Sequence, residues 1–162
     1  GAAPARWSQL VRNRLGDSGK VFALDILPMQ SIAGVDFLQG DFREESVLRQ
    51  LEARLKGHRL DLVLCDIAPN MSGVALADQI RAMALAELAL DFSRQWLKPG
   101  GSFLIKLFQG VGFDDYLRCL RADFSRVTMR KPKASRARSR EVYALATGRK
   151  PAAVPLASTV HE

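Results

Sequence analysis

Runs of strand-forming residues alternate along this chain with segments of helical periodicity, and this alternation restricts the possible folds more than any other feature. The run Leu60–Cys65 is largely apolar, as expected of a parallel strand that is covered on both faces. Such alternation predicts an α/β fold with a doubly wound, mostly parallel sheet. Strands are expected at 20–24, 35–38, 60–65, 102–108, 125–130 and 141–146, and helices at 7–15, 44–55, 78–97 and 113–122.

The connections and the ends of the chain give further expectations. The sequence Lys98–Gly101 contains a proline and two glycines and is expected to end the longest helix. The segment 131–139 contains no helix, which permits an antiparallel pair of last strands, since a parallel pair needs a crossover. A doubly wound sheet begins with a strand that feeds a glycine-led turn, so the first strand and a preceding helix are expected upstream of Gly1. From Gly148 the sequence is rich in Pro and Ala, and we expect one domain over 1–150 and a disordered tail over 151–162.

The positive charge is concentrated near the C-terminus. The formal net charge is +7, and the segment 126–150 alone contains nine Lys or Arg residues and one acid. Concentrated basic charge predicts a polyanionic partner, because neutralising phosphates releases counterions. The alternative is a solvated basic face without a partner. The residues expected to contact the polyanion are Arg130, Lys131, Lys133, Arg136, Arg138 and Arg140.

Cysteine usage and hydropathy indicate the compartment. The two cysteines, one of them inside an apolar strand, lack the pattern of a disulfide framework, which favours a reducing compartment such as the cytoplasm. No apolar run in the sequence approaches the ~18 residues that a membrane span requires. We therefore expect a cytoplasmic protein without a membrane segment and without a metal site.

Polar residues stand where three of the expected strands begin or end. Asp66 follows the run Leu60–Cys65, Lys106 lies near the end of the strand at 102–108, and Glu141 opens the last strand. Loops at the ends of strands in an open α/β sheet gather in one crevice, where ligands bind. The alternative is that these are solvated strand ends, but burying a lysine is costly unless it is paired. We therefore expect Asp66, Lys106 and Glu141 to form a catalytic group.

Two acids at other strand ends indicate an adenosine ligand. Asp25 ends the second strand of the expected sheet, where an acid typically hydrogen-bonds the ribose hydroxyls of such a ligand. Asp41 follows the next strand and could accept from an adenine amino group, or could instead cap a loop. The glycine-led turn at Gly1 lacks the G-x-G-x-x-G pattern of a dinucleotide site, which disfavours a nicotinamide-dependent reductase.

Several segments form motifs that are more specific than a generic nucleotide-binding fold. The two most specific are Asp66–Gly73 (DIAPNMSG) and Ser135–Tyr143 (SRARSREVY). Further motif segments are Gly1–Gln9, Asp25–Met29, Val35–Phe42, Pro99–Phe103 and Lys106–Gly110. Together they resemble the FtsJ family of bacterial large-subunit ribosomal RNA 2′-O-methyltransferases, which have a Rossmann-like fold. The resemblance covers nearly the whole chain.

The resemblance implies S-adenosyl-L-methionine as the cofactor and a set of site residues. The family uses a Lys-Asp-Lys-Glu tetrad, of which Asp66, Lys106 and Glu141 match the last three members; the first lysine would lie upstream. Lys106 would accept the proton of the ribose 2′-hydroxyl, Asp66 would position Lys106, and Glu141 would orient it. The positions implied to bind the cofactor are Gly1, Ala5, Trp7, Asp25, Ile26, Asp41, Phe42 and Asp66.

The implied substrate is a uridine in the A-loop of 23S rRNA, methylated on the assembled 50S subunit by a monomeric enzyme. The basic segment would then bind RNA. In this chain Ala5 and Arg6 stand where the family has two glycines. This departure favours an alternative, a catalytically impaired RNA-binding or ribosome-assembly factor of the same fold.

Overall fold

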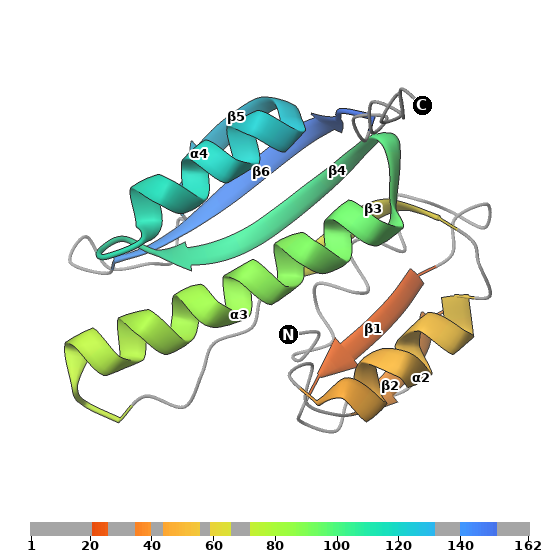
Figure 1. The fold of residues 1–162 in the computed structure, drawn as a ribbon, viewed down its shortest axis with the longest axis horizontal. Coiled ribbons are helices and arrows are strands. Elements are labelled where there is room, and N and C mark those ends of the chain that lie inside the picture. Colours follow the sequence, from red (N-terminus) through yellow and green to blue (C-terminus); the bar gives the residue numbers. More distant parts are fainter. Residues whose placement is uncertain are drawn as a thin grey trace, which may run out of the picture.

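The structure is a computed structural model that describes residues 21–25, 35–39, 44–55, 59–65, 72–131 and 140–151. The expected helix at 7–15 lies outside these residues. Along the described residues the elements are, in order, β1 (Val21–Asp25), β2 (Val35–Gln39), α2 (Glu45–Leu55), β3 (Leu60–Cys65), α3 (Ala75–Trp96), β4 (Leu97–Phe108), α4 (Phe113–Asp123), β5 (Phe124–Arg130) and β6 (Glu141–Arg149), as drawn in Figure 1.

The strands form a four-stranded sheet and a separate two-stranded pair. The four-stranded sheet has the order β3-β4-β6-β5, and no ladder joins it to the β1-β2 pair among the described residues. The pairs β1-β2 and β3-β4 are parallel, whereas β6 is antiparallel to both β4 and β5. The last strand alone therefore runs against its sheet, which confirms the predicted mostly parallel α/β sheet with an antiparallel last strand.

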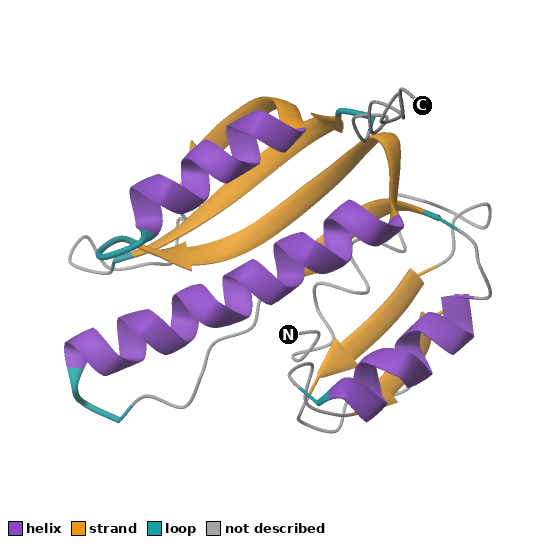
Figure 2. Ribbon diagram, viewed as in Figure 1, coloured by secondary structure: helices purple, strands orange, loops and turns teal. Residues whose placement is uncertain are grey.

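Helices α3 and α4 cover one face of the four-stranded sheet (Figure 2). Buried residues of α2 form a cluster with Phe92 of α3, and Leu60 and Val63 of β3 pack against that cluster. Phe103, Ile105 and Leu107 of β4 are buried beneath α3 and α4, and the Phe103 ring stacks on Phe124 with centroids 6.2 Å apart. Each such burial contributes about 1.5–3 kcal/mol relative to exposure. Because side chains alternate along a strand, the opposite face of β4 presents Lys106 and Phe108.

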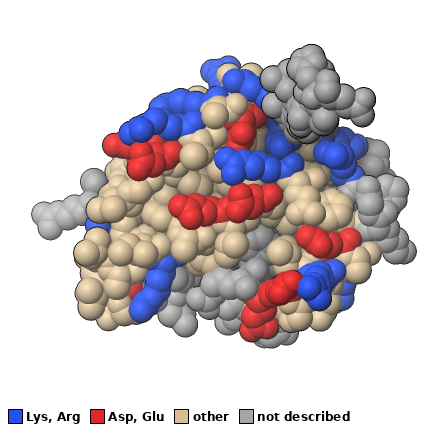
Figure 3. Space-filling view, in the orientation of Figure 1, with Lys and Arg blue, Asp and Glu red and all other residues tan. Residues whose placement is uncertain are grey.

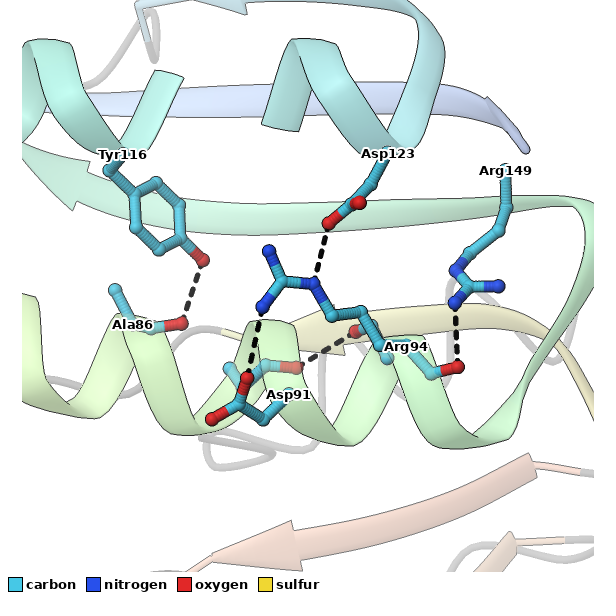
Figure 4. Close-up of polar contacts among 8 residues, drawn as sticks. Ala86, Asp91, Arg94, Tyr116, Asp123 and Arg149 are labelled. Atoms are coloured by element: carbon cyan, nitrogen blue, oxygen red, sulfur yellow. Dashed lines mark hydrogen bonds and ion pairs between the residues drawn. The ribbon is translucent and has the colours of Figure 1, made fainter. Parts of the chain in front are cut away.

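Three polar contacts join α3 to the C-terminal elements (Figure 4). The hydroxyl of Tyr116 on α4 donates to the carbonyl oxygen of Ala86 at 2.7 Å. Arg94 donates from Nε to Asp123 Oδ2 at 2.6 Å, and it also pairs with Asp91. The guanidinium of Arg149, at the end of β6, donates to the carbonyl oxygen of Arg94 at 2.7 Å, close to the C-terminus of α3 where carbonyls lack helical partners.

The connection between α3 and β4 differs from the expectation. The helix ends at Trp96, close to the segment Lys98–Gly101 that was expected to end it, but the strand expected at 102–108 begins already at Leu97. The register with β3 shifts between Leu60 and Leu62, whose partners are Leu97 and Ser102, so the proline and glycines form an irregular, bulged start to the strand. Gly100 has φ +83°, a conformation that favours glycine.

Two further boundaries were also predicted incorrectly. Helix α3 begins at Ala75 rather than Asp78, and the Asp78 side chain accepts hydrogen bonds from the backbone just before the helix. Strand β6 continues to Arg149, so Gly148 belongs to the sheet and not to the tail, whose residues 152–162 lie outside the described part. The cause is pairing with β5, where Arg149 lies opposite Phe124. Within the described ranges, no helix is long and apolar enough to cross a membrane.

Candidate active site

Lys106 and Glu141 lie side by side at one end of the sheet. Phe108 is paired with Glu141 and Lys106 with Tyr143 across the β4-β6 ladder, which brings the lysine diagonally opposite the glutamate. Lys106 Nζ is 4.0 Å from Glu141 Oε1, and the two side chains are 13% and 36% exposed. Lys106 Nζ also lies 6.0 Å from the centroid of the Phe108 ring. The pair is thus a half-buried charge pair that solvent or a ligand reaches from the glutamate side.

A row of side chains crosses three strands at the same level. Tyr143 of β6 lies directly opposite Lys106 of β4 and directly opposite Arg130 of β5. Directly opposite residues point to the same face, so Lys106, Tyr143 and Arg130 share the face turned away from α3 and α4. Tyr143 was not predicted as a site residue, although its place two positions after Glu141 in a strand indicates the same face.

Asp66, the third predicted catalytic residue, lies outside the described residues. It follows Cys65, the last residue of β3, and Cys65 pairs with Ile105, the residue before Lys106. The parallel ladder therefore ends with the chain directed toward the Lys106 end of β4. The assignment of Asp66, Lys106 and Glu141 as catalytic stays a prediction.

Among the predicted cofactor-binding positions, the described part contains Asp25. It is the last residue of β1 and lies opposite Gln39, the last residue of the parallel strand β2. The carboxyl ends of these strands are thus level, which is the edge where ligands bind in such sheets. The other predicted positions lie outside the described residues: Gly1, Ala5, Trp7, Ile26, Asp41, Phe42 and Asp66.

The predicted RNA-binding residues surround the same end of β5 and β6. Arg130 ends β5, Lys131 follows it, and Arg140 directly precedes β6; all three are exposed. Lys133, Arg136 and Arg138 lie outside the described residues. On the helix-covered face, in contrast, acidic groups lie between the basic ones (Figure 3). The helix-covered face therefore carries charges of both signs and is not a basic surface.

Asp78 anchors the last residues of the Asp66–Gly73 motif to α3. Its carboxylate accepts hydrogen bonds from the Ser72 backbone N–H at 2.8 Å, the Ser72 hydroxyl at 2.7 Å and the Gly73 N–H at 3.2 Å. The N–H and hydroxyl of Ser72 lower the pKa of Asp78, against the opposing effect of burial, and Gly73 and Arg81 lower it further. This anchor was not predicted, because an aspartate at the start of an expected helix is the ordinary pattern of a helix N-terminus.

Comparison with known proteins identifies the family. The sequence profile of the FtsJ-like methyltransferases matches residues 1–149. The chain belongs to the FtsJ-like methyltransferase family. The Ribosomal RNA large subunit methyltransferase E of Stenotrophomonas maltophilia is 62% identical over 150 residues, which make up 93% of this chain and 71% of that protein.

Solved structures show that this FtsJ-like chain has a methyltransferase fold. A crystal structure from Plasmodium falciparum, named as a ribosomal RNA methyltransferase, matches with a TM-score of 0.80 at 24% identity, over 92% of this chain and 83% of that one. Human Methyltransferase-like protein 13, solved in complex with SAH, matches with a TM-score of 0.56 at 16% identity, over 93% of this chain and 69% of that one. The predicted fold class is confirmed.

FtsJ-like methyltransferases use S-adenosylmethionine, and the one predicted cofactor residue in the described part fits that cofactor. Asp25 stands at the carboxyl end of β1, where an acid can accept hydrogen bonds from ribose hydroxyls. Lys106 and Glu141 lie at the end of β4 and the start of β6, where loops bound a crevice in this type of sheet. Within the described residues, no group of three or more His, Cys, Asp or Glu is placed to hold a metal ion.

Proposed function

We propose that this FtsJ-like chain methylates the ribose 2′-oxygen of a uridine in the A-loop of 23S rRNA, on the assembled 50S subunit. The observation that supports this proposal is the Lys106–Glu141 pair, 4.0 Å apart, at the sheet end of a chain that is 62% identical to a protein named as a large-subunit rRNA methyltransferase. Acting on ribosomal subunits would place the enzyme in the cytoplasm, and we propose that it acts there as a monomer.

The cofactor and the side chains have separate tasks in this proposal. S-adenosylmethionine supplies an electrophilic methyl group on a sulfonium. Lys106 Nζ, after its ammonium has passed one proton to solvent, accepts the proton that the 2′-hydroxyl loses as its oxygen is methylated. Glu141 Oε1, 4.0 Å from Nζ, holds the lysine in place, and Asp66 positions it from the end of β3. Alignment of the reacting groups contributes most, because a sulfonium is already a good leaving group.

Cofactor and RNA binding are assigned to different segments of the chain in this proposal. Asp25 accepts from the ribose hydroxyls of S-adenosylmethionine, and the remaining predicted cofactor positions lie outside the described residues. Arg130, Lys131 and Arg140, with Lys133, Arg136 and Arg138, contact RNA phosphates beside Lys106. Recognition then depends largely on RNA shape, with the phosphate contacts fixing orientation.

The test compares two lysines of β4. Lys106→Ala should lower the turnover number about 10²- to 10⁴-fold, the range of general acid–base catalysis, while S-adenosylmethionine still binds in a calorimetric titration. Lys98→Ala is the matched control, because Lys98 is half-exposed and only pairs with Asp61 at 3.3 Å on the surface. The assay follows tritiated methyl transfer to large subunits from cells that lack this modification, and primer extension locates the methylated nucleotide.

Two results would contradict the proposal in different ways. Full turnover in Lys106→Ala would remove that residue from the chemistry. A wild-type protein that binds the subunit but transfers no methyl group would instead favour the impaired RNA-binding or assembly factor, which the Ala5-Arg6 departure suggests.

A further inference from the structure

Gln79 is a buried amide in the second turn of α3 that bonds to the chain just after the candidate active site. It is 5% exposed, and its Nε2 donates both hydrogens, to the carbonyl oxygen of Phe108 at 2.8 Å and to that of Val111 at 3.0 Å. One side chain therefore holds the last residue of β4 and the turn that follows it. Neither of the motifs around Lys106 and Glu141 includes Gln79.

The Phe108 carbonyl lies beyond the described ladder between β3 and β4. The backbone N–H of Gln109 donates to the carbonyl oxygen of Arg140 at 3.0 Å, so at this residue the backbone polar groups point toward β6. Successive residues of a strand alternate, and the carbonyl of Phe108 therefore points to the β3 side. Within the described residues, Ile105 is the last residue of β4 that pairs with β3, and at Phe108 the donor to the carbonyl oxygen is the Gln79 side chain.

Phe108 connects this bond to both members of the catalytic pair. Its ring lies 6.0 Å from Lys106 Nζ, and the residue itself is the cross-strand partner of Glu141. Gln109, the next residue, holds the Arg140 carbonyl, one position before Glu141. A shift of Phe108 would therefore displace the ring beside Lys106 Nζ and, at the same time, disturb the pairing of Phe108 with Glu141.

The turn after β4 lies close to the Gln79 carboxamide at Gly110, where a side chain would not fit. A Cβ on Gly110 would stand 3.0–3.2 Å from three atoms of the Gln79 carboxamide, closer than nearly all real contacts of that kind. Gly110 also has φ +150°, and its carbonyl oxygen accepts from the Phe113 N–H that begins α4. Gln79 is thus packed against the turn as well as hydrogen-bonded to it.

We propose that Gln79 is a positioning residue for methyl transfer: by holding the Phe108 and Val111 carbonyls it fixes the end of β4 and so the place of Lys106 relative to Glu141. The catalytic part of this inference rests on the proposed function; the structural part does not. Gln79 acts through Phe108 and touches neither substrate nor cofactor in this role.

The experiment removes the N–H donor of the Gln79 side chain and keeps the side-chain volume nearly the same. Gln79→Met retains a long unbranched side chain of similar helix propensity but has no N–H group to donate. The control is Gln95→Met on the same helix, where the glutamine is exposed. If Gln79→Met does not fold, Gln79→Asn carries the test, because an amide one methylene shorter cannot reach both carbonyls.

Two readouts are measured at a temperature where circular dichroism shows the variant to be folded. The turnover number should fall about 10- to 100-fold, the scale of a misplacement near 1 Å, while KM for the subunit and cofactor affinity stay unchanged. In protein labelled with ¹³C at lysine Cε, the Lys106 resonance, assigned by its loss in Lys106→Ala, should move in Gln79→Met and stay in place in Gln95→Met.

An unmoved Lys106 resonance together with an unchanged turnover number in folded Gln79→Met would overturn the inference. So would an activity loss that merely follows the unfolded fraction while the resonance of the folded molecules stays in place. If the wild-type protein transfers no methyl group, the proposed function fails by itself, and the Lys106 resonance still decides whether Gln79 positions the lysine.

Discussion

Tyr116 illustrates how a single side chain joins two helices. It is 3% exposed, and its hydroxyl donates to a carbonyl of α3 while its ring belongs to the core beneath the sheet. Burial raises the pKa of Tyr116 well above its ordinary value of 10.0, because the phenolate would lose its hydration. The unfolded chain therefore loses this proton at a lower pH than the folded protein does.

Tyr116→Phe should lower the free energy of unfolding by about 0.5–1.5 kcal/mol at neutral pH, the net worth of one hydrogen bond. The wild-type protein should also lose stability as the pH rises above 10.0, since the unfolded state then releases a proton that the folded state keeps. Urea unfolding at several pH values measures both effects. In a Tyr143→Phe background, Tyr116 is the remaining tyrosine and its phenolate absorbance should appear only on unfolding; ionisation of the folded protein near pH 10 would contradict this.

At the scale of elements, two consecutive residues near the start of α3 hold the segments that precede α3 and follow β4. Asp78 binds Ser72 and Gly73 at the end of the DIAPNMSG motif, and Gln79 binds the turn after β4. Consecutive residues of one helix thus connect the segments that follow β3 and β4. Hydrophobic periodicity predicts that a helix lies here, but it says nothing about these two polar contacts, which depend on the loops that approach the helix.

Asp78→Asn should lower the thermal midpoint at pH 7, because the amide cannot accept all three hydrogen bonds as a carboxylate does. A lowered native pKa stabilises the protein at pH above the ordinary value of 3.8, and this stabilisation is lost as the pH falls through the native value. The difference between the two proteins in free energy of unfolding should therefore shrink below about pH 4. Asp115→Asn, which removes an exposed carboxylate paired with Arg118 in the first turn of α4, is the control. An equal effect of both substitutions would contradict the anchor.

At the scale of the whole molecule, the sheet separates two kinds of surface. The face with α3 and α4 presents mixed charges (Figure 3), whereas Arg130 shares the opposite face with Lys106 and Tyr143. Arg140 lies at the same end of the sheet, directly before Glu141. Phosphates bound by these arginines would lie beside the proposed catalytic pair.

Arg130→Ala and Arg140→Ala should each weaken RNA binding and reduce the slope of log affinity against log salt by about 0.7–0.9, the value for one lost phosphate contact. Arg118→Ala on the helix-covered face should leave the slope unchanged, since Arg118 is exposed and pairs with Asp115 there. Filter binding of an A-loop RNA over a range of salt concentrations measures the slopes. Identical slopes for all three variants would remove Arg130 and Arg140 from the interface.

Local sequence patterns were enough to predict the type and order of the described elements. The run Leu60–Cys65 became β3 with the predicted bounds, and the helical spacing of Val47, Leu51 and Leu55 became the buried stripe of α2. These features depend on the side chains of neighbouring residues, and the periodicity of burial records them directly. The DIAPNMSG and SRARSREVY motifs likewise identified the family from local order alone.

Which residues face one another depends on how the elements pack, and local sequence does not show it. The insertion of β6 between β4 and β5 sets the row of Lys106, Tyr143 and Arg130, and pairing with β5 extends β6 to Arg149. The bond from Gln79 to Phe108 joins residues 29 positions apart. Register and such long-range bonds arise when separate elements pack together, and a strand or a glutamine has the same local sequence whichever partner it meets.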